Sequence, residues 1–284
     1  MSKLLVFQTD FTYKEGAVPA MYGVVKGVDR NLEIITATHE IPQYDIWSAS
    51  YRLYQYVPFW PNDTVFVSVV DPGVGTSRKA CVAKLSNGNY VVTPDNGTLT
   101  HLDKYFGIVE VREIDETINR LRGKDNEEVA VFHGRDLFGY CAAKLAAGII
   151  TYEQVGPKYD LKEIQRLEIV EPEIKDNKIV GTFEIMDPNF GNLWGNVPKK
   201  MFEDFGFKHG DKVRTTIYKN NIEVFKQDLY YYQSFSMAEN KTIMIYNNEL
   251  NKISLAEVVG NLAKDYNLGY GSEYRVEFEG IKNE

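Results

Sequence analysis

The sequence predicts an α/β amino-terminal domain, three-layered with a largely parallel sheet, followed by a smaller, mainly antiparallel β carboxy-terminal domain. Up to about residue 150, short apolar runs alternate with helix-like apolar spacing, which is typical of βαβ units. Beyond about residue 165, short alternating segments are separated by Gly, Asn and Asp turns, which is typical of antiparallel sheets. A chain of 284 residues is comfortable for two domains. We place them at residues 1–165 and 166–284, with a polar linker at 156–163.

The elements of the first domain follow from residue spacing. Strands are expected at residues 4–8, 32–37, 64–70, 108–114 and 129–132. Helices are expected at residues 17–30, 44–59, 98–106 and 137–147, where apolar residues recur every three to four positions. Asn87 and Gly88 lie between two apolar runs, 80–84 and 90–93, and predict a hairpin because both residues tolerate positive φ.

The second domain is expected to contain only short strands, at residues 178–185, 212–218, 221–226, 242–246 and 274–278. The net charge of -8 argues against a general nucleic-acid binder. Cys81 and Cys141 lie in apolar contexts without metal-ligand spacing, as reduced core thiols do. The chain turns polar by Gln8, and no apolar run approaches the ~18 residues of a membrane span. We therefore expect a cytoplasmic protein without nucleic-acid or membrane partners.

One strand end stands out as a place for a ligand. The run 64–70 stops at a carboxylate, a proline and two glycines, in the stretch VVDPGVGTSR at residues 69–78. Asp71 lies at the tip and Arg78 follows after a tight turn. Ligands of open α/β sheets bind at the carboxyl ends of strands. Two similar turns are TDF at 9–11 and HGRD at 133–136, and we expect all three to converge on one site.

Residue types suggest what these turns can do, with a structural alternative for each. Asp71, Arg78 and His133 offer a carboxylate, a fixed cation and an imidazole, which together can hold and polarise a water. The alternative is a structural ion pair beside a hydrogen-bonded histidine. Asp10 can accept hydrogen bonds from a sugar diol, or can cap the following turn. The Walker and Rossmann patterns do not occur, which favours a nucleoside ligand without a phosphate chain.

Two further stretches each allow a functional and a structural interpretation. Gly134 can let a backbone N–H approach a nucleophile, at the start of a helix that favours anions. Alternatively, the turn is a helix cap in which Asp136 stabilises the first helical turn. The stretch DPNFGNLWGN at 187–196 holds two aromatics that can cradle an adenine, or is a Gly/Asn-rich turn with core aromatics. The remaining histidines show no partner spacing, so no metal site is expected.

Five motifs, in this order, resemble those of the S-adenosyl-L-methionine (SAM) hydroxide adenosyltransferase family, relatives of the SAM-dependent fluorinase and chlorinase. They are TDF (9–11), DPGVGTSR (71–78), PDNG (94–97), HGRD (133–136) and FGNLW (190–194). The resemblance implies an α/β domain followed by a β-domain. It also implies homotrimers in which SAM lies between the first domain of one subunit and the second domain of its neighbour.

The resemblance also implies residue roles. Asp10 is implied to bind the ribose diol, and Phe11 belongs to the same substrate-binding turn. Asp71, Arg78 and His133 are implied to form a water-handling triad, with Gly134 at the nucleophile. The implied contacts to methionine and adenine from the adjacent subunit are Asp187, Phe190, Asn192 and Trp194, with Phe235 stacking near the adenine.

The implied reaction is SAM hydrolysis. Water or hydroxide attacks the ribose C5′, methionine leaves and adenosine is released, with SAM as substrate and no metal or cofactor. Asp71 or His133 is expected to accept the proton. The halogenases that the chain resembles carry tyrosine in place of the Asp71-type carboxylate and lack this histidine, and a carboxylate at that place repels halide. The alternatives are a SAM- or adenosine-binding sensor without turnover and a SAM-dependent halogenase.

The chain departs from the family pattern late in its sequence. Residues 247–252 read NNELNK where relatives carry a glycine-containing turn that helps bind adenine, and no glycine follows until Gly260. No adenine contacts are therefore assigned to the stretch 247–260.

Overall fold

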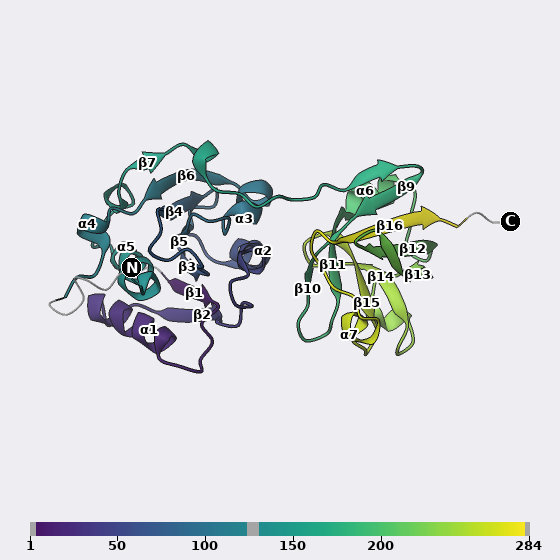
Figure 1. Ribbon diagram of the computed structural model, residues 1–284, viewed down its shortest axis with the longest axis horizontal. Helices are drawn as coiled ribbons and strands as arrows, with labels where there is room; N and C mark the ends of the chain where they lie inside the picture. The colour runs from purple at the N-terminus through teal and green to yellow at the C-terminus, as the bar shows by residue number, and fades with distance from the viewer. Residues whose placement is uncertain (1–3, 124–130, 282–284) are drawn as a thin grey trace. The chain divides into compact units, whose positions relative to one another are not determined.

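A computed structural model describes residues 4–123 and 131–281. The chain divides into two compact units, residues 1–167 and 168–284 (Figure 1), here called the first and second unit. The stretch expected to be a linker, 156–163, belongs to the first unit. Its strand β7 (Lys158–Tyr159) pairs antiparallel with β6 (Ile108–Glu113), so backbone hydrogen bonds hold it in the sheet.

The first unit is built on a seven-stranded sheet in the order β2-β1-β3-β5-β4-β6-β7. Its parallel strands are β1 (Leu5–Thr9), β2 (Ile34–Thr38), β3 (Val65–Val69) and β5 (Tyr90–Pro94). Strand β4 (Ala80–Leu85) is antiparallel to both β5 and β6. Strand β6 therefore points the same way as β5, and five of the seven strands share one direction.

Helices cover both faces of this sheet (Figure 1). They are α1 (Ala17–Val28) and α5 (Tyr140–Ala146) on one face, and α2 (Ile46–Tyr56) and α3 (Thr100–Tyr105) on the other. Leu5 and Phe7 of β1 pack in the core under α1 and α5, whereas Val6 packs in the core under α2 and α3. This alternation is what a strand buried on both faces requires, and it confirms the predicted three-layer α/β fold.

Two boundaries in the first unit differ from the prediction. Of the strand expected at 129–132, Val129 and Ala130 lie outside the described residues, and Val131 and Phe132 form no strand. The helix expected from 137 begins earlier, as a π-helical turn over Gly134–Gly139 that continues into α5. Helix α2 gives way to a 3₁₀ turn at Val57–Phe59, because Pro58 has no N–H to continue the helix.

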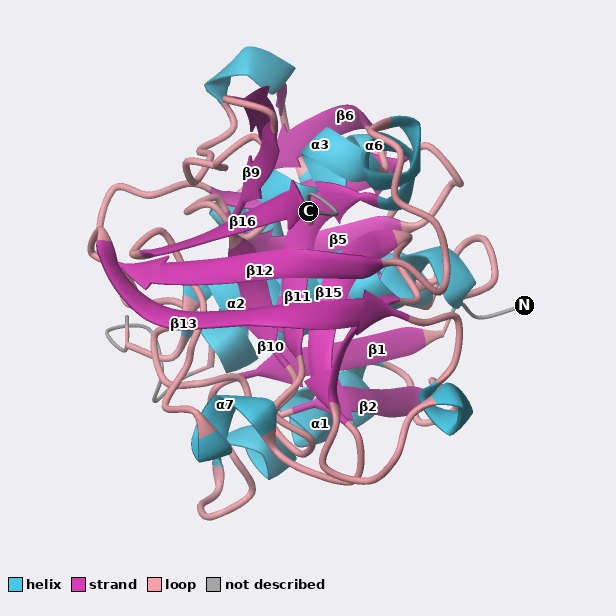
Figure 2. Ribbon diagram, turned by 90° about the vertical axis from the view of Figure 1, so that its right-hand side faces the viewer, coloured by secondary structure: helices cyan, strands magenta, loops and turns pink. Residues whose placement is uncertain are grey.

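The second unit contains a nine-stranded sheet in the order β10-β11-β15-β14-β13-β12-β16-β9-β8. Figure 2 shows its long strands β12 and β13 side by side. Its strands are β8 (Glu173–Lys175), β9 (Lys178–Gly181), β10 (Phe183–Met186), β11 (Leu193–Pro198), β12 (Lys212–Lys219), β13 (Ile222–Tyr231), β14 (Ile243–Asn247), β15 (Lys252–Glu257) and β16 (Tyr274–Gly280). Only β13 and β14 pair in parallel among these described strands. The predicted, mainly antiparallel β-domain is thus confirmed. The short helices of the chain are α4 (Glu116–Asn119), α6 (Lys199–Asp204) and α7 (Leu262–Asp265).

The stretch 247–260, to which the sequence analysis assigned no adenine contacts, contains strand β15. The turn that leads into it uses asparagines where a glycine would be usual. Asn251 adopts a φ of 57°, and the Asn248 side chain accepts hydrogen bonds from the backbone N–H groups of Leu250 and Lys252. Asparagine tolerates positive φ and can close a turn with its own side chain.

Cys81 lies in β4 and Cys141 in α5, and both are buried free thiols. Burial raises the pKa of each thiol, that of Cys141 to about 12. Across residues 4–123 and 131–281, we find no helix with the length and apolar character that a membrane crossing demands.

Candidate active site

Two carboxylates follow the carboxyl ends of neighbouring parallel strands in the first sheet. Thr9 of β1 pairs with Val69 of β3. Asp10 directly follows Thr9, and Asp71 lies two residues after Val69. Burial raises the pKa of Asp10, and the charge of Asp71 adds to this rise. The backbone N–H of Tyr44, which donates to Asp10 Oδ2 at 2.9 Å, lowers the pKa and partly offsets it. The two carboxylates are therefore close enough to influence each other.

Arg78 links Asp71 to His133. Its Nε lies 2.9 and 3.2 Å from the two carboxylate oxygens of Asp71, and its Nη2 also donates to Asp71 Oδ2. The same Nη2 lies 2.9 Å from His133 Nδ1. The side chains of Arg78 and Asp71 are only 10% and 5% exposed. Carboxylate, guanidinium and imidazole thus form one buried chain, as the strand-end argument predicted.

This geometry fixes the tautomer of His133. A guanidinium can only donate hydrogen bonds, so Nδ1 must accept, and the proton of the neutral ring lies on Nε2. Burial, and next the charge of Arg78, lower the pKa of His133 and keep the ring neutral. Within the part of the chain that the structure describes, Nε2 is buried and has no hydrogen-bond partner. His133 therefore presents an unused N–H donor.

Arg78 is also held by an aromatic ring and by its own loop. Its guanidinium carbon lies 5.2 Å from the centre of the Phe138 ring, a cation–π contact. Thr76 Oγ1 donates to the carbonyl of Gly73 at 2.7 Å, and Gly75 has a φ of 78°, which suits glycine. Phe138 was not among the predicted site residues, because nothing in its spacing distinguishes it from a core aromatic.

Gly134 brings the 9–11 turn against the 133–136 turn. A Cβ at Gly134 would lie 3.2 Å from ring atoms of both Phe11 and Phe132, so only glycine fits there without displacing a ring. Asp136 does not cap this turn. It is 2% exposed and is bound by Arg135, with Nε to Oδ1 at 2.6 Å and Nη2 to Oδ2 at 2.9 Å.

A histidine that the sequence analysis set aside holds the Asp10 turn. His39 Nδ1 hydrogen-bonds Thr9 Oγ1 at 2.8 Å, His39 Nε2 hydrogen-bonds the Tyr22 hydroxyl at 2.7 Å, and the His39 carbonyl accepts from Thr12 N–H at 2.8 Å. Burial lowers the pKa of His39 to about 4. The sequence showed no partner spacing because the partners come from β1 and α1, distant in the chain.

In the second unit, Asp187 organises the turn that carries Phe190 and Asn192. Its Oδ1 accepts from the backbone N–H groups of Asn189 and Phe190 at 2.9 and 3.1 Å. Its own N–H donates to the carbonyl of Asn192 at 2.9 Å. Phe190 is 63% exposed. The aromatic side chain is thus presented outward by a turn whose shape Asp187 fixes.

Trp194 and Phe235 meet at Tyr246, a residue that the sequence analysis did not single out. The rings of Phe235 and Tyr246 have centres 5.1 Å apart, and the Trp194 side chain lies close enough to the Tyr246 hydroxyl to influence its pKa. Burial raises the pKa of Tyr246, and the charge of Asp187 adds to this. Phe235 therefore packs against a tyrosine of β14 whose pKa Asp187 and Trp194 also influence. The sequence marked Tyr246 only as an aromatic in an alternating strand.

Sequence models of the SAM hydroxide adenosyltransferase N-terminal and C-terminal domains match residues 5–156 and 181–275. The chain belongs to the SAM hydroxide adenosyltransferase family. It is 28% identical over 278 residues to an (R)-S-adenosyl-L-methionine hydrolase of Methanocaldococcus jannaschii, covering 96% of this chain and 95% of that relative. It is 25% identical over 299 residues to a fluorinase of Nocardia brasiliensis, covering 96% of each.

A solved structure of an uncharacterized conserved protein from Thermotoga maritima has the same fold as this SAM hydroxide adenosyltransferase family member. The TM-score is 0.86 at 30% sequence identity, with 97% of this chain and 100% of that chain covered. The relatives named hydrolase support an enzyme of this family. Because the family includes both hydrolases and fluorinases, the choice of nucleophile has to be argued from the site itself. No cluster of three His, Cys, Asp or Glu side chains suited to a metal ion occurs among the described residues.

Proposed function

We propose that the protein is a SAM hydrolase, in which water displaces L-methionine from the ribose C5′ of SAM and adenosine is released. The observation that carries this proposal is the buried chain Asp71–Arg78–His133, in which a carboxylate and an unused N–H donor are held by one arginine. Such a pair can orient a neutral water from both of its sides, since the carboxylate accepts a proton and the imidazole donates one.

The main task of the protein in this reaction is to orient the water relative to C5′. The bond from the water oxygen to C5′ forms while the C5′–S bond breaks, and its electron pair goes to the sulfur of methionine. Generating free hydroxide from water of pKa ~15.7 would be costly, so the proton passes to Asp71 as the bond forms. His133 Nε2–H holds the water oxygen and does not act as the base. Arg78 keeps both groups in place, which is where most of the rate enhancement arises.

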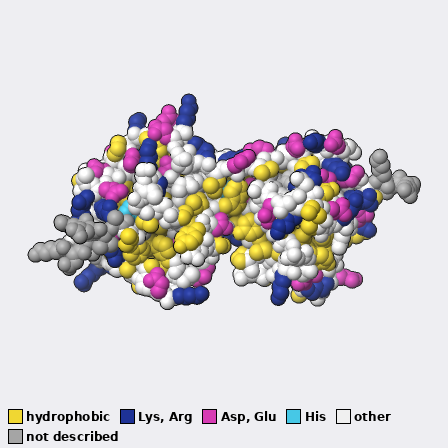
Figure 3. Space-filling model, viewed as in Figure 1, with side chains coloured by type: hydrophobic (Ala, Val, Ile, Leu, Met, Phe, Trp, Pro, Cys, Tyr) yellow, Lys and Arg dark blue, Asp and Glu magenta, His cyan; other side chains and the backbone are white. Residues whose placement is uncertain are grey.

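The remaining site residues are assigned from the family resemblance. Asp10 binds the ribose diol beside Phe11, and the Gly134 backbone lies at the nucleophile. The methionine and adenine contacts come from the neighbouring subunit of a homotrimer, through Asp187, Phe190, Asn192, Trp194 and Phe235. Exposed apolar side chains on both units support such subunit contacts (Figure 3), among them Tyr44 at 62% and Phe190 at 63% exposure. The reaction needs no metal or cofactor.

Water is favoured over halide because the Asp71 carboxylate repels an anion at short range. The test is to incubate the purified protein with SAM, with and without chloride or fluoride, and to quantify adenosine, methionine and 5′-halo-adenosines. We expect adenosine and methionine in equal amounts, independent of halide, and a loss of about 100-fold or more in Asp71→Asn and Arg78→Ala.

The matched control is Arg214→Ala, which removes another arginine–aspartate pair, that with Asp228 at 2.9 Å in the second unit, and should leave turnover unchanged. SAM binding without products would favour a sensor. Halogenated products formed as fast as adenosine would make the protein a halogenase.

A further inference from the structure

The PDNG turn at residues 94–97 belongs to the family motifs but has no role in the site described above. It follows β5, whereas the Asp71–Arg78 loop follows β3. Asn96 Nδ2 donates to the carbonyl of Val70 at 2.9 Å, and the backbone N–H of Asp95 donates to the carbonyl of Lys79 at 2.9 Å. Val70 directly precedes Asp71 and Lys79 directly follows Arg78, so this turn holds both stems of the catalytic loop.

The orientation of the Asn96 amide is fixed. Its Oδ1 accepts from the Thr98 hydroxyl at 2.8 Å and from the Thr98 backbone N–H at 3.3 Å, so the amide nitrogen has to face Val70. The carbonyl of Val70 belongs to the peptide unit that also carries the N–H of Asp71. Its hydrogen bond therefore sets the rotation of that peptide plane and, through it, the direction of the Asp71 side chain.

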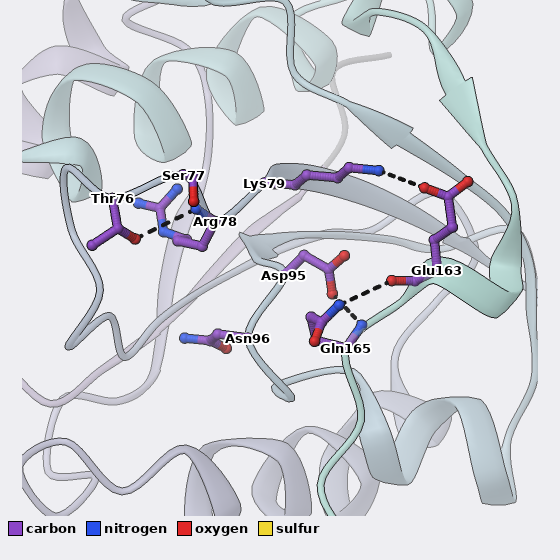
Figure 4. Close-up of a pocket in the computed structure, with 8 residues that line it drawn as sticks. All are labelled: Thr76, Ser77, Arg78, Lys79, Asp95, Asn96, Glu163 and Gln165. Atoms are coloured by element: carbon purple, nitrogen blue, oxygen red, sulfur yellow. Dashed lines mark hydrogen bonds and ion pairs between the residues drawn. The ribbon is translucent and has the colours of Figure 1, made fainter.

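One side of the loop faces an open cleft. Residues 76–79, Asp95 and Asn96 of the PDNG turn, and residues 163 and 165 border an open polar cleft of about 650 Å³ (Figure 4). Figure 4 shows Asn96 across the cleft from Lys79 and Glu163, which pair at 2.9 Å on the far wall. Because the loop faces a cleft on this side, hydrogen bonds to its two stems contribute to the positions of Asp71 and Arg78.

The Asp95 side chain serves a different purpose, which provides a control. It is 3% exposed and accepts from the Tyr159 hydroxyl at 2.9 Å and from the Gln165 N–H at 2.8 Å. These bonds hold the segment around residues 159–165 and do not involve the stems of the catalytic loop. One turn thus has two separable functions, one on each side.

We infer that Asn96 is a positioning residue for the Asp71–Arg78 pair, acting through the carbonyl of Val70. The expected effect of Asn96 on kcat rests on the proposed function. The expected effect on the geometry of Asp71, Arg78 and His133 does not. Asn96→Asp keeps the side-chain shape and replaces the amide donor with an oxygen that faces the Val70 carbonyl. The repulsion shifts the peptide before Asp71 and withdraws Arg78 from His133.

The kinetic test compares Asn96→Asp with Tyr159→Phe, which removes a buried hydrogen bond from the other side of the same turn. We expect kcat of Asn96→Asp to fall about 10- to 100-fold while KM for SAM changes less than about threefold, because the ground-state contacts of Asp10 are untouched. Tyr159→Phe should lower the melting temperature but keep kcat. Asn96→Ala, which deletes the donor without adding charge, is measured alongside and should show the same split.

A second readout does not depend on turnover. The chain has only four histidines, so the ¹⁵N resonances of His133 can be assigned with a His133→Gln variant. The wild type should show an unprotonated Nδ1 and a protonated Nε2, and Asn96→Asp should lose this single tautomer, whereas Tyr159→Phe should retain it. A wild type that forms no adenosine would reject the proposed function alone. Wild-type kcat and His133 resonances in both Asn96 variants, or an equal kcat loss in Tyr159→Phe, would overturn the inference.

Discussion

In the proposed mechanism, His133 acts through the proton on its Nε2. Arg78 donates to its Nδ1, and burial and the charge of Arg78 lower its pKa, so the ring stays neutral with Nε2–H as a donor. We therefore expect kcat to stay level as the pH falls through the ordinary histidine pKa of about 6.5, and to decline only below it, when the ring gains its second proton. Initial rates of adenosine formation between pH 5 and 9 measure this.

The donor role also predicts which substitution is tolerated. His133→Gln keeps a side-chain N–H and should retain at least about tenfold more activity than His133→Ala, the value of one good hydrogen bond. A descending limb near pH 6.5 that disappears in His133→Gln would instead show that His133 is the base.

Gly134 is a second residue whose identity the geometry dictates. Gly134→Ala would force its new Cβ to within 3.2 Å of the Phe11 and Phe132 rings, which should cost about 1–3 kcal/mol of unfolding free energy and raise KM for SAM, since Phe11 adjoins Asp10. Urea unfolding measures the first effect. Gly23→Ala is the control: Gly23 lies on α1 with nothing within 4 Å of its Cβ position, so it should stabilise by about 0.5–1 kcal/mol. Equal effects at the two glycines would contradict the packing argument.

At the scale of elements, a buried ion pair joins two strands of the second sheet. Lys252 Nζ of β15 lies 2.6 Å from Glu184 Oε2 of β10, and the side chains are 6% and 1% exposed. Lys252→Met leaves a buried carboxylate without this partner and should destabilise by about 3–5 kcal/mol. The double variant Glu184→Leu/Lys252→Met should recover most of that loss in urea unfolding. A double variant less stable than Lys252→Met would mean that the pair is not the source of the cost.

The sequence allowed most strands and helices of the first unit to be placed within a few residues, because buried strands and amphipathic helices have distinct apolar periods. The strand expected at 129–132 is an exception, since Val131 and Phe132 form no strand. In the second unit, strands β8, β11 and β15 were missed, and the single strand expected at 178–185 is two strands, β9 and β10, which are not neighbours in the sheet. The residues of β11 include Gly195 and Asn196, which have low strand propensity, and pairing with β10 and β15 overrides that preference. The linker at 156–163 was misassigned because β7 is a two-residue edge strand, too short to have a periodic signature.

The candidate site could be predicted only in part. Asp10 and Asp71 could be predicted because the end of a buried strand can be located in the sequence, and ligands bind at strand ends in this fold class. His39, Asn96 and Tyr246 were not assigned roles, since each acts through partners brought close only by folding. The tautomer of His133 likewise required the position of Arg78, 55 residues earlier.

At the scale of the whole molecule, the proposed homotrimer predicts that the two units of different chains complement each other. Asp71→Asn inactivates the first unit, and Phe190→Ala/Phe235→Ala, at two exposed side chains, impairs the second. Each variant alone should be inactive. If each site is shared by two subunits, an equal mixture reassembled from unfolded chains should recover up to about a quarter of wild-type activity, because random assembly restores that share of sites.

The mass of the assembly in analytical ultracentrifugation is measured on the same samples. A trimer without recovery would place both halves of each site on one chain, and a monomer with full wild-type activity would remove the subunit argument altogether.

The two cysteines give the molecule a practical property. Both are buried, and the pKa of each thiol is raised, so neither supplies the thiolate that maleimide reagents require. The native cysteines should therefore react little with maleimide reagents during site-directed labelling. A cysteine introduced at an exposed position, through Val109→Cys in the first unit or Ile222→Cys in the second, would therefore be the one reactive thiol among the described residues, and a fluorophore attached there would report on a single chosen position.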